Sequence, residues 1–439
     1  MQNINVIGGG LAGCEAAYRI ANEGFAVKLW EMRPKNSTPV HQTSKLAELV
    51  CSNSLKSDLD NTAQGLLKRE MRILNSLLLS CAEEARVPAG SALAVDRNVF
   101  SDVVSRKIME HPGIEVVREE IKEIPASGVW IVATGPLSSE GICQSLQELS
   151  GEENLFFFDA VAPSITLESI NTSKAYRASR YGKGSADYLN CPFNEQEYEN
   201  FYNALIKADI KEGHSIDKSH LFDACMPIEI MAHRGKDTLR FGPMRPVGLS
   251  RSEEDAIRPY AIVQLRQEDL AGTIFGLVGF QTRMRWGDQD RVFRLIPGLE
   301  NAEFVRYGVM HRNTYINSPK LLHPSLQLRK EPRIFFAGQI TGVEGYMESA
   351  AAGIIAGINA VRFLKGQKAL VPGPYTMIGS LLNFISSLPG DNFQPINANF
   401  GLLPPLENRV KDRQKRYSAY VARALDKMNE FSELLPKQL

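Results

Sequence analysis

The residues best suited to covalent chemistry are six cysteines, scattered along the 439-residue chain at positions 14, 51, 81, 143, 191 and 225. No two of them form a C-x-x-C pair, so their spacing argues against a zinc site or a thioredoxin-like motif, and we expect no bound metal. A thiolate is a good nucleophile, yet a free cysteine is commonly a buried, inert side chain. Spacing alone therefore does not say which cysteine reacts.

A glycine pattern near the N-terminus predicts a dinucleotide site. Gly8, Gly10 and Gly13 form G-x-G-x-x-G between a predicted strand and a predicted helix, and Glu31 follows the next predicted strand. The first glycine permits a tight turn, the second lets the backbone approach a pyrophosphate, and the third lets helix and strand pack closely. The helix N-terminus favours the phosphates, and Glu31 is placed to accept hydrogen bonds from a ribose. The competing interpretation is a glycine-rich turn without a ligand. The candidate cofactor-binding residues here are Gly8, Gly9, Gly10, Leu11, Ala12, Gly13, Glu31 and Arg33.

Apolar runs predict the elements that position this site. Strands are expected at residues 5–7, 26–30, 129–133 and 333–337, and helices at residues 62–85, 348–363 and 409–427. The stretch from about residue 160 to 325 lacks the β-α rhythm and suggests a mixed α+β insertion. We therefore predict an α/β fold, in which a Rossmann-type domain with a parallel sheet and flanking helices surrounds an α+β insertion domain. Its expected parts are residues 1–165 and 326–439, the second ending in a basic helix, and the insertion is expected at residues 166–325.

The composition is that of an ordinary globular protein, with 44% hydrophobic and 23% charged residues and a formal net charge of zero. Zero net charge does not indicate a nucleic-acid partner, although a neutral chain can still carry a basic face. The N-terminus lacks the pattern of a signal peptide, and no apolar run approaches the ~20 residues that span a bilayer. We expect a cytoplasmic protein without a membrane partner, whose thiols are reduced.

Two later segments indicate that the dinucleotide is FAD rather than NAD. Residues 129–135 resemble the apolar strand and Ala-Thr-Gly of the two-dinucleotide flavoproteins, and residues 335–338 resemble their C-terminal flavin motif. In this chain Gln339 replaces the acidic residue that usually follows the glycine of that motif. This departure restricts the flavoprotein families to which the chain can belong. The resemblance adds four candidate FAD contacts, Gly135, Gly338, Gln339 and Gly342.

Longer segments resemble one family, the flavin- and folate-dependent tRNA uridine methyltransferases. The resemblance covers essentially the whole chain and rests on residues 48–55, 222–229, 240–244, 337–346 and 399–404. It implies transfer of a one-carbon unit from methylenetetrahydrofolate to C5 of the T-loop uridine in tRNA. Reduced FAD would supply the hydride, and NAD(P)H would reduce the flavin again.

The resemblance also assigns roles to two cysteines. Uracil C5 is a poor nucleophile until a group adds to C6, and Cys225 would be the thiolate that does so. Cys51 would lie near the isoalloxazine ring, either in proton transfer or in guarding the one-carbon unit. The other four cysteines are expected to be inert.

Candidate contacts to folate and RNA follow from position and charge. His311 falls where the family contacts the folate ring, and Arg283 and Arg285 could bind the folate glutamate or tRNA phosphates. A cluster of cations near the C-terminus would suit a phosphate track. In each case the alternative is an ordinary structural or solvated side chain. The cations of the cluster are Arg409, Lys411, Arg413, Lys415 and Arg416.

Several functions stay open at this point. The same chemistry could act on a ribosomal RNA uridine, or the chain could be an FAD oxidoreductase of small molecules, or a scaffold without enzyme activity that binds FAD or RNA. A small-molecule oxidoreductase would not need Cys51, Cys225 and the basic C-terminal segment together. A scaffold would not need a flavin site.

Overall fold

The computed structural model describes residues 3–38, 40–151, 155–182, 185–210, 226–249, 258–387 and 393–436, without the side chains of residues 155–159 and 311–312. Its centre is a five-stranded parallel sheet in the order β16-β7-β1-β2-β6. The strands are β1 (Ile4–Ile7), β2 (Val27–Trp30), β6 (Ile114–Val117), β7 (Val129–Val132) and β16 (Ile334–Phe336). The parallel sheet built from both ends of the chain confirms the predicted Rossmann-type α/β fold.

Helices cover this sheet, in which the apolar strands β7 and β16 are buried along their whole length. The tightest packing is between α1 (Leu11–Asn22) and α11 (Tyr346–Leu364), where a Cβ added to Gly353 would lie 2.2 Å from the carbonyl oxygen of Ala12. Of the helices in the described residues, α11 is long and apolar enough to cross a membrane, but its apolar window is 83% buried. It is therefore a core helix of this fold.

The predicted single helix over residues 62–85 is wrong, since the chain forms two helices there. Asn75 adopts a left-handed conformation with φ 56°, and Ser76 caps the second helix through its side chain. The buried Glu15 carboxylate accepts hydrogen bonds from the first N–H groups of that helix. The break thus depends on a partner from α1, which the local pattern does not reveal. The remaining elements of this part are α2 (Ala63–Ile73), α3 (Leu77–Glu84), β3 (Ser54–Ser57), β4 (Arg86–Val87), β5 (Ala92–Val95), α4 (Arg97–Met109) and α5 (Glu140–Ser150).

The middle of the chain forms a six-stranded sheet in the order β10-β11-β12-β13-β9-β14, whose neighbouring strands pair antiparallel. It has its own hydrophobic core, as expected of an α+β insertion. Its strands are β9 (Ser164–Thr166), β10 (Tyr176–Arg177), β11 (Leu189–Phe193), β12 (Ala261–Gln267), β13 (Ile274–Leu277) and β14 (Phe304–Arg306). Its helices are α6 (Glu195–Ile206), α7 (Ile228–His233), α8 (Thr238–Phe241) and α9 (Trp286–Phe293).

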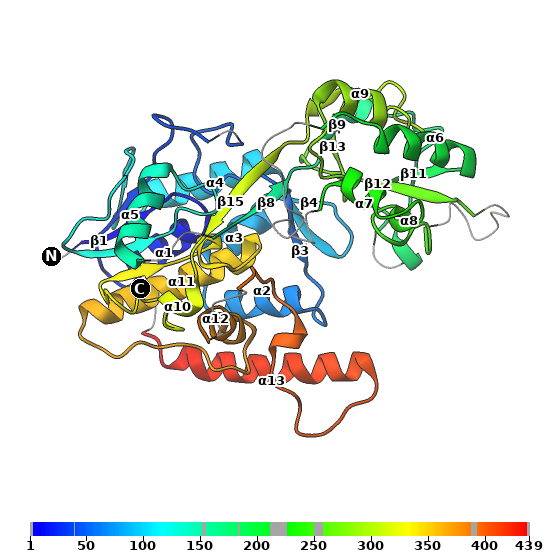
Figure 1. Cartoon of the computed structure of the whole chain (residues 1–439). Coiled ribbons are helices and arrows are strands. Elements are labelled where there is room, and N and C mark those ends of the chain that lie inside the picture. Colours follow the sequence, from blue (N-terminus) through cyan, green and yellow to red (C-terminus); the bar gives the residue numbers. More distant parts are fainter. Residues whose placement is uncertain are drawn as a thin grey trace.

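Figure 1 shows the inserted sheet at one end of the molecule, joined to the parallel sheet through the antiparallel pair β8 (Leu155–Ala160) and β15 (Met310–Tyr315). The residue boundaries predicted for the domains stay a prediction. The last helix, α13 (Arg413–Glu433), packs against α2 below the parallel sheet in this view. Two further helices, α10 (Ser318–Leu321) and α12 (Met377–Ser387), pack against each other on the same side.

Candidate functional site

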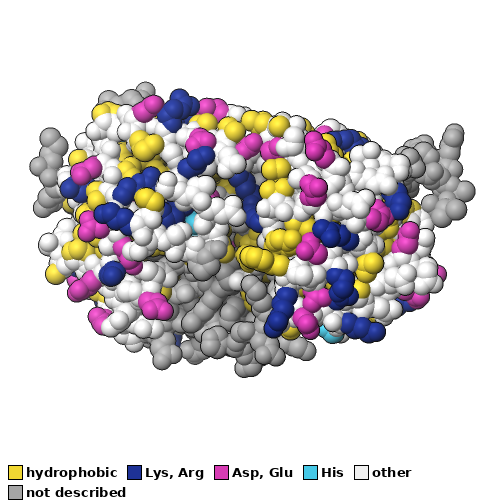
Figure 2. Space-filling view, turned by 90° about the horizontal axis from the view of Figure 1, so that it is seen from above, with side chains coloured by type: hydrophobic (Ala, Val, Ile, Leu, Met, Phe, Trp, Pro, Cys, Tyr) yellow, Lys and Arg dark blue, Asp and Glu magenta, His cyan; other side chains and the backbone are white. Residues whose placement is uncertain are grey.

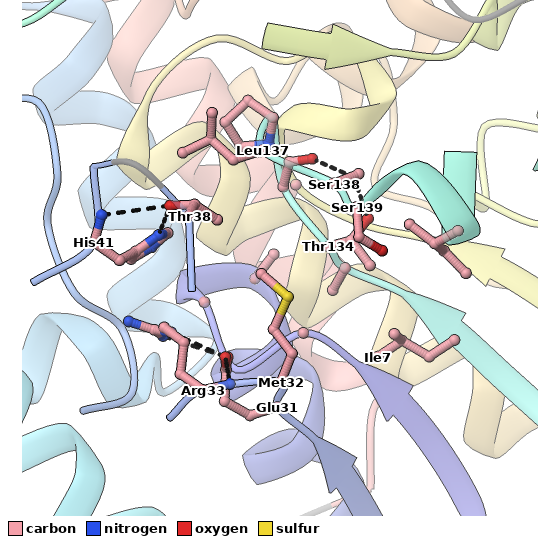
Figure 3. A pocket seen from close by; sticks show the side chains of 18 of the residues that line it. Ile7, Glu31, Met32, Arg33, Thr38, His41, Thr134, Leu137, Ser138 and Ser139 are labelled. Atoms are coloured by element: carbon pink, nitrogen blue, oxygen red, sulfur yellow. Dashed lines mark hydrogen bonds and ion pairs between the residues drawn. The ribbon is translucent and has the colours of Figure 1, made fainter. Parts of the chain in front are cut away.

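A cavity lies beyond the carboxyl ends of the parallel strands. This is where open α/β sheets bind their ligands. The turns after β1, β2, β7 and β16 all contribute to its lining. Figure 3 shows Glu31 and Arg33 at the end of one strand and Thr134 and Ser138 at the end of another, all around this cavity.

The glycine turn after β1 has a different steric reason at each glycine. Gly8 has φ 104°, a conformation that favours glycine. A Cβ added to Gly13 would lie 1.9 Å from the carbonyl oxygen of Gly8, so helix and strand could not pack as they do. A Cβ added to Gly10 would meet nothing within 4 Å, because Gly10 borders the cavity. Leu11 and Ala12 also line the cavity, whereas Gly9 lies behind it against the Glu31 carboxylate.

The N-terminus of α1 points its free N–H groups toward this cavity. Gly10 is the N-cap residue and no side chain caps the helix. The first N–H groups of a helix lack partners within the helix, and the helix dipole adds partial positive charge there. The end of α1 is therefore suited to hold phosphate oxygens.

Glu31 is a buried carboxylate that is already held in place. Its oxygens accept hydrogen bonds from the backbone N–H of Gly9 at 2.9 Å and from Arg33 Nε at 2.9 Å. Arg33 also donates to Glu48 Oε2 at 2.9 Å. Burial alone would raise the pKa of Glu31, but the hydrogen bonds and charge of Arg33 hold it below its usual value. Glu31 therefore stays ionised. The Arg33 backbone N–H at 2.9 Å and Arg33 Nη2 at 3.3 Å also donate to it, so all four acceptor positions of the carboxylate are in use.

The two later motifs, one ending at Gly135 and one containing Gly338, reach the same cavity. Gly135 has φ 68°, and a Cβ added there would meet nothing within 4 Å. Gly338 and Gln339 line the cavity near the start of α11, and the Gln339 amide donates to the Glu344 carboxylate. Gly342 lies elsewhere, in a turn where an added Cβ would be 2.4 Å from the Phe393 ring. Its expected FAD contact stays a prediction.

Cys51 lies at the edge of the cavity. Its neighbour Val50 and the Tyr346 ring both line the cavity, and the Tyr346 hydroxyl accepts hydrogen bonds from the backbone N–H of Cys51 at 2.8 Å and of Ser52 at 3.1 Å. Burial raises the pKa of Tyr346, so this hydroxyl stays protonated. We call residues 50–53 the Cys51 segment. Tyr346 was not predicted as a site residue. The sequence marks it only by its position at the end of the segment 337–346, which carries the family resemblance.

Three of the remaining cysteines in the described residues, Cys14, Cys81 and Cys191, are buried. Burial raises the pKa of Cys81 and of Cys191 to about 12, and raises that of Cys14 as well. A thiol with a raised pKa supplies little thiolate at neutral pH. Cys143 is half-buried.

Cys225, the expected nucleophile, falls outside the described residues, but the chain just after it is described. The Ile228 N–H donates to the carbonyl oxygen of Gln281 at 2.8 Å, and the buried Glu229 accepts from the Arg283 N–H at 3.1 Å. The Arg283 guanidinium lies 3.7 Å from the same carboxylate. Arg283 is therefore placed beside the segment that follows Cys225.

The other expected folate contacts are more dispersed. Arg285 is exposed and is the N-cap residue of α9. His311 lies on β15, where its backbone is paired with Asp159, and its side chain is outside the described residues. Neither Arg283 nor Arg285 is among the described residues that line the cavity.

The basic segment begins before its helix. Arg409 and Lys411 precede α13, which starts at Arg413 because the Asp412 side chain caps it by accepting from the Lys415 N–H at 2.8 Å. The predicted helix over residues 409–427 is therefore wrong at both ends. Arg409, Lys411, Arg413 and Lys415 are exposed, and Arg416 is half-buried with a bond to the carbonyl oxygen of Val410. On the face seen in Figure 2, which is turned away from α13, Lys and Arg side chains lie interspersed with Asp and Glu.

Comparison with known proteins gives the family. The model of the family described as glucose inhibited division protein A matches residues 3–368. A protein of Syntrophomonas wolfei named methylenetetrahydrofolate–tRNA-(uracil-5-)-methyltransferase TrmFO is 69% identical, over 99% of this chain and 100% of the relative. A protein of the same name from Moorella thermoacetica is 55% identical, over 98% of each chain.

Among solved structures, GidA of Aquifex aeolicus superposes with a TM-score of 0.71 at 17% identity, covering 100% of this chain and 74% of that one. At this identity the match supports the fold. The chain belongs to the glucose inhibited division protein A family and, within it, to the group of relatives named methylenetetrahydrofolate–tRNA-(uracil-5-)-methyltransferase.

Proposed function

We propose that this protein is a folate- and FAD-dependent tRNA methyltransferase that converts the T-loop uridine to 5-methyluridine. Methylenetetrahydrofolate donates the carbon, and NAD(P)H supplies the reducing equivalents. The observation that carries the proposal is the 69% identity over 99% of the chain to a relative with this activity in its name. A small-molecule oxidoreductase would leave that similarity unexplained.

The cavity residues suit FAD. The N–H groups at the start of α1 are free to bind a pyrophosphate beside Gly10, where an added side chain would enter open space. Glu31 is anionic and lines the cavity, where a ribose hydroxyl would donate a hydrogen bond to an oxygen that Glu31 shares with Gly9 or Arg33. Gly135, Gly338 and Gln339 border the same cavity and would hold the rest of the cofactor. When bound, FAD supplies the hydride that completes the methyl group.

We assign two roles to the cysteines. The Cys225 thiolate adds to C6 of uracil, which makes C5 nucleophilic, and it leaves again once C5 has lost its proton. Tyr346 holds the Cys51 backbone next to Val50, which lines the cavity, and this supports a position for Cys51 beside the flavin. Proton transfer and shielding of the one-carbon unit are both compatible with that position.

Contacts to the other substrates are assigned by charge and place. Arg283, Arg285 and His311 would bind folate. The two arginines are alternatively assigned to tRNA phosphates. The exposed cations from Arg409 to Lys415 would bind RNA backbone. We place the reaction in the cytoplasm.

The test is to incubate the purified protein with tRNA lacking modifications, methylenetetrahydrofolate and NAD(P)H, and to map 5-methyluridine by mass spectrometry of nuclease digests. A parallel reaction uses ribosomal RNA. Formation of 5-methyluridine in the T-loop supports the proposal. Product in ribosomal RNA alone would redirect it, and no product in either RNA from a flavin-loaded protein would refute it.

A further inference from the structure

Two arginines of the inserted sheet hold the Cys51 segment from outside the flavin-binding part. Arg306, at the end of β14, donates from Nη1 to the carbonyl oxygen of Val50 at 3.3 Å. Arg266, on β12, donates from Nη2 to Ser52 Oγ and from Nε to Asn53 Oδ1, both at 2.8 Å. The inserted sheet thus lies directly against the segment that carries the cysteine.

A third arginine approaches from the flavin-binding part. Arg97 is the first residue of α4, and its Nη2 donates to Glu268 Oε1 at 3.0 Å. The same carboxylate lies 3.9 Å from Arg306 Nη2, so Arg97 and Arg306 share one acidic partner. Since Arg306 also bonds to Val50, this pair of arginines adjoins the Cys51 segment.

The positive charge of this cluster exceeds its negative charge. Glu268 is the carboxylate that pairs with it in the described residues, bonded to Arg97 and 3.9 Å from Arg306 Nη2. Its second oxygen also accepts a hydrogen bond from Ser164 at 2.7 Å. Arg266 is bonded to the neutral Ser52 and Asn53.

The same cluster has unused hydrogen-bond donors. Nε of Arg97 and Nε of Arg306 are buried and have no hydrogen-bond partner among the described residues. The two side chains keep 16% and 19% of their surface exposed, so a ligand can reach their outer atoms, whereas the Nε atoms themselves lie below the surface. Charged groups removed from water are costly unless an opposite charge pairs with them. The cluster has more guanidinium groups than carboxylates, and two of its N–H donors have no partner in the described residues. A bound anion would supply the missing negative charge and acceptor atoms.

We propose that Arg97 and Arg306, bridged by Glu268, form a subsite beside Cys51 for an oxyanion group carried by a substrate. The planar fork of arginine matches carboxylate and phosphate oxygens. The inference rests on the proposed function, in which two such groups arrive together: the glutamate carboxylates of the folate and the phosphates next to the target uridine. Nε of Arg283 also lacks a partner among the described residues, but the carboxylate beside Arg283 is Glu229, in the part of the chain after Cys225, and not a group of the Cys51 segment.

The experiment measures binding, without turnover. The FAD-loaded full-length protein is titrated separately with tetrahydrofolate, with 6-methyltetrahydropterin, which lacks the carboxylates, and with tRNA at several salt concentrations. The variants are Arg97→Gln, Arg97→Lys and Arg306→Gln. Arg86→Gln is the matched control, since Arg86 is an exposed arginine of the flavin-binding part that pairs with Glu83. Flavin content and the urea midpoint establish that each variant is folded.

If the subsite takes a carboxylate, the glutamine variants lose about tenfold or more in tetrahydrofolate affinity and none in pterin affinity. If it takes a phosphate, they lose that factor for tRNA and the salt dependence becomes shallower. Arg97→Lys, which keeps the charge but not the fork, falls between wild type and Arg97→Gln.

Affinities within twofold of Arg86→Gln for both substrates would overturn the inference while leaving the proposed function intact. Equal losses of affinity for tetrahydrofolate and for the pterin would overturn it too. The arginines would then affect binding by maintaining the local structure and not by contacting the carboxylates. A wild-type protein that binds neither tetrahydrofolate nor tRNA would refute the proposed function together with the inference.

Discussion

Replacing Tyr346 with phenylalanine removes one oxygen atom and leaves the ring in place. That oxygen accepts hydrogen bonds from the Cys51 and Ser52 N–H groups at 2.8 and 3.1 Å. Leaving a buried donor without a partner costs about 1–3 kcal/mol, whereas a donor that water can reach loses much less. Both residues are half-buried, so water replaces part of the loss. We expect Tyr346→Phe to lower the free energy of unfolding by about 1–3 kcal/mol in total.

The effect on activity should exceed the effect on stability, because the lost bonds hold Cys51 at the cavity. Urea unfolding gives the stability, the absorbance spectrum gives the bound flavin, and 5-methyluridine formation gives the activity. We expect flavin to stay bound while methylation falls at least tenfold. Tyr202→Phe is the control, since its hydroxyl donates to the carbonyl oxygen of Ala232 at 3.2 Å within the insertion. It should lose stability but not activity. Wild-type stability and methylation in Tyr346→Phe would refute this reasoning.

Three further predictions concern the cofactor, the RNA and the nucleophile. Gly10→Val should fold but lose FAD, because its side chain enters the cavity where nothing lies within 4 Å of the added Cβ; Gly287→Val, equally open but on α9, should keep the flavin spectrum. Arg413→Glu combined with Lys415→Glu should weaken tRNA binding and flatten its salt dependence, with FAD retained; an unchanged salt slope would make this segment an ordinary solvated surface. Cys225→Ala should bind FAD and oxidise NAD(P)H but make no 5-methyluridine, and wild-type protein with 5-fluorouridine RNA should form a covalent adduct that peptide mapping places on Cys225. An adduct on another cysteine would overturn the assignment.

The parts of the fold that follow from local pattern were predictable from sequence. The strand expected at residues 5–7, the glycine turn and Glu31 form one local unit, and the residue types themselves show what the backbone requires there. The strand at residues 129–133 and the motif beginning at Gly338 belong to the same site although they are far apart in the chain. Their common site was predictable because the carboxyl ends of the parallel strands in such a sheet lie along one edge.

What escaped prediction depends on contacts between distant segments. The break near Asn75 needs the Glu15 carboxylate from α1. The position of Cys51 depends on the hydroxyl group of Tyr346, which lies 295 residues further along the chain. No periodicity in the sequence encodes such a pair. The pairing of Arg97, at the start of α4, with Glu268, just after β12, joins the flavin-binding part to the insertion in the same way, and neither residue stands in a recognisable motif.

The central claim is that the carbon of the folate becomes the methyl group of the T-loop uridine. The direct measurement uses methylenetetrahydrofolate labelled with ¹³C at the methylene carbon, together with tRNA, NAD(P)H and the FAD-loaded protein. Mass spectrometry then follows the label into nucleoside digests. The account predicts labelled 5-methyluridine at the T-loop position, formed only when the reductant is present. Consumption of NAD(P)H by a flavin-loaded protein, with no label in the RNA, would contradict it.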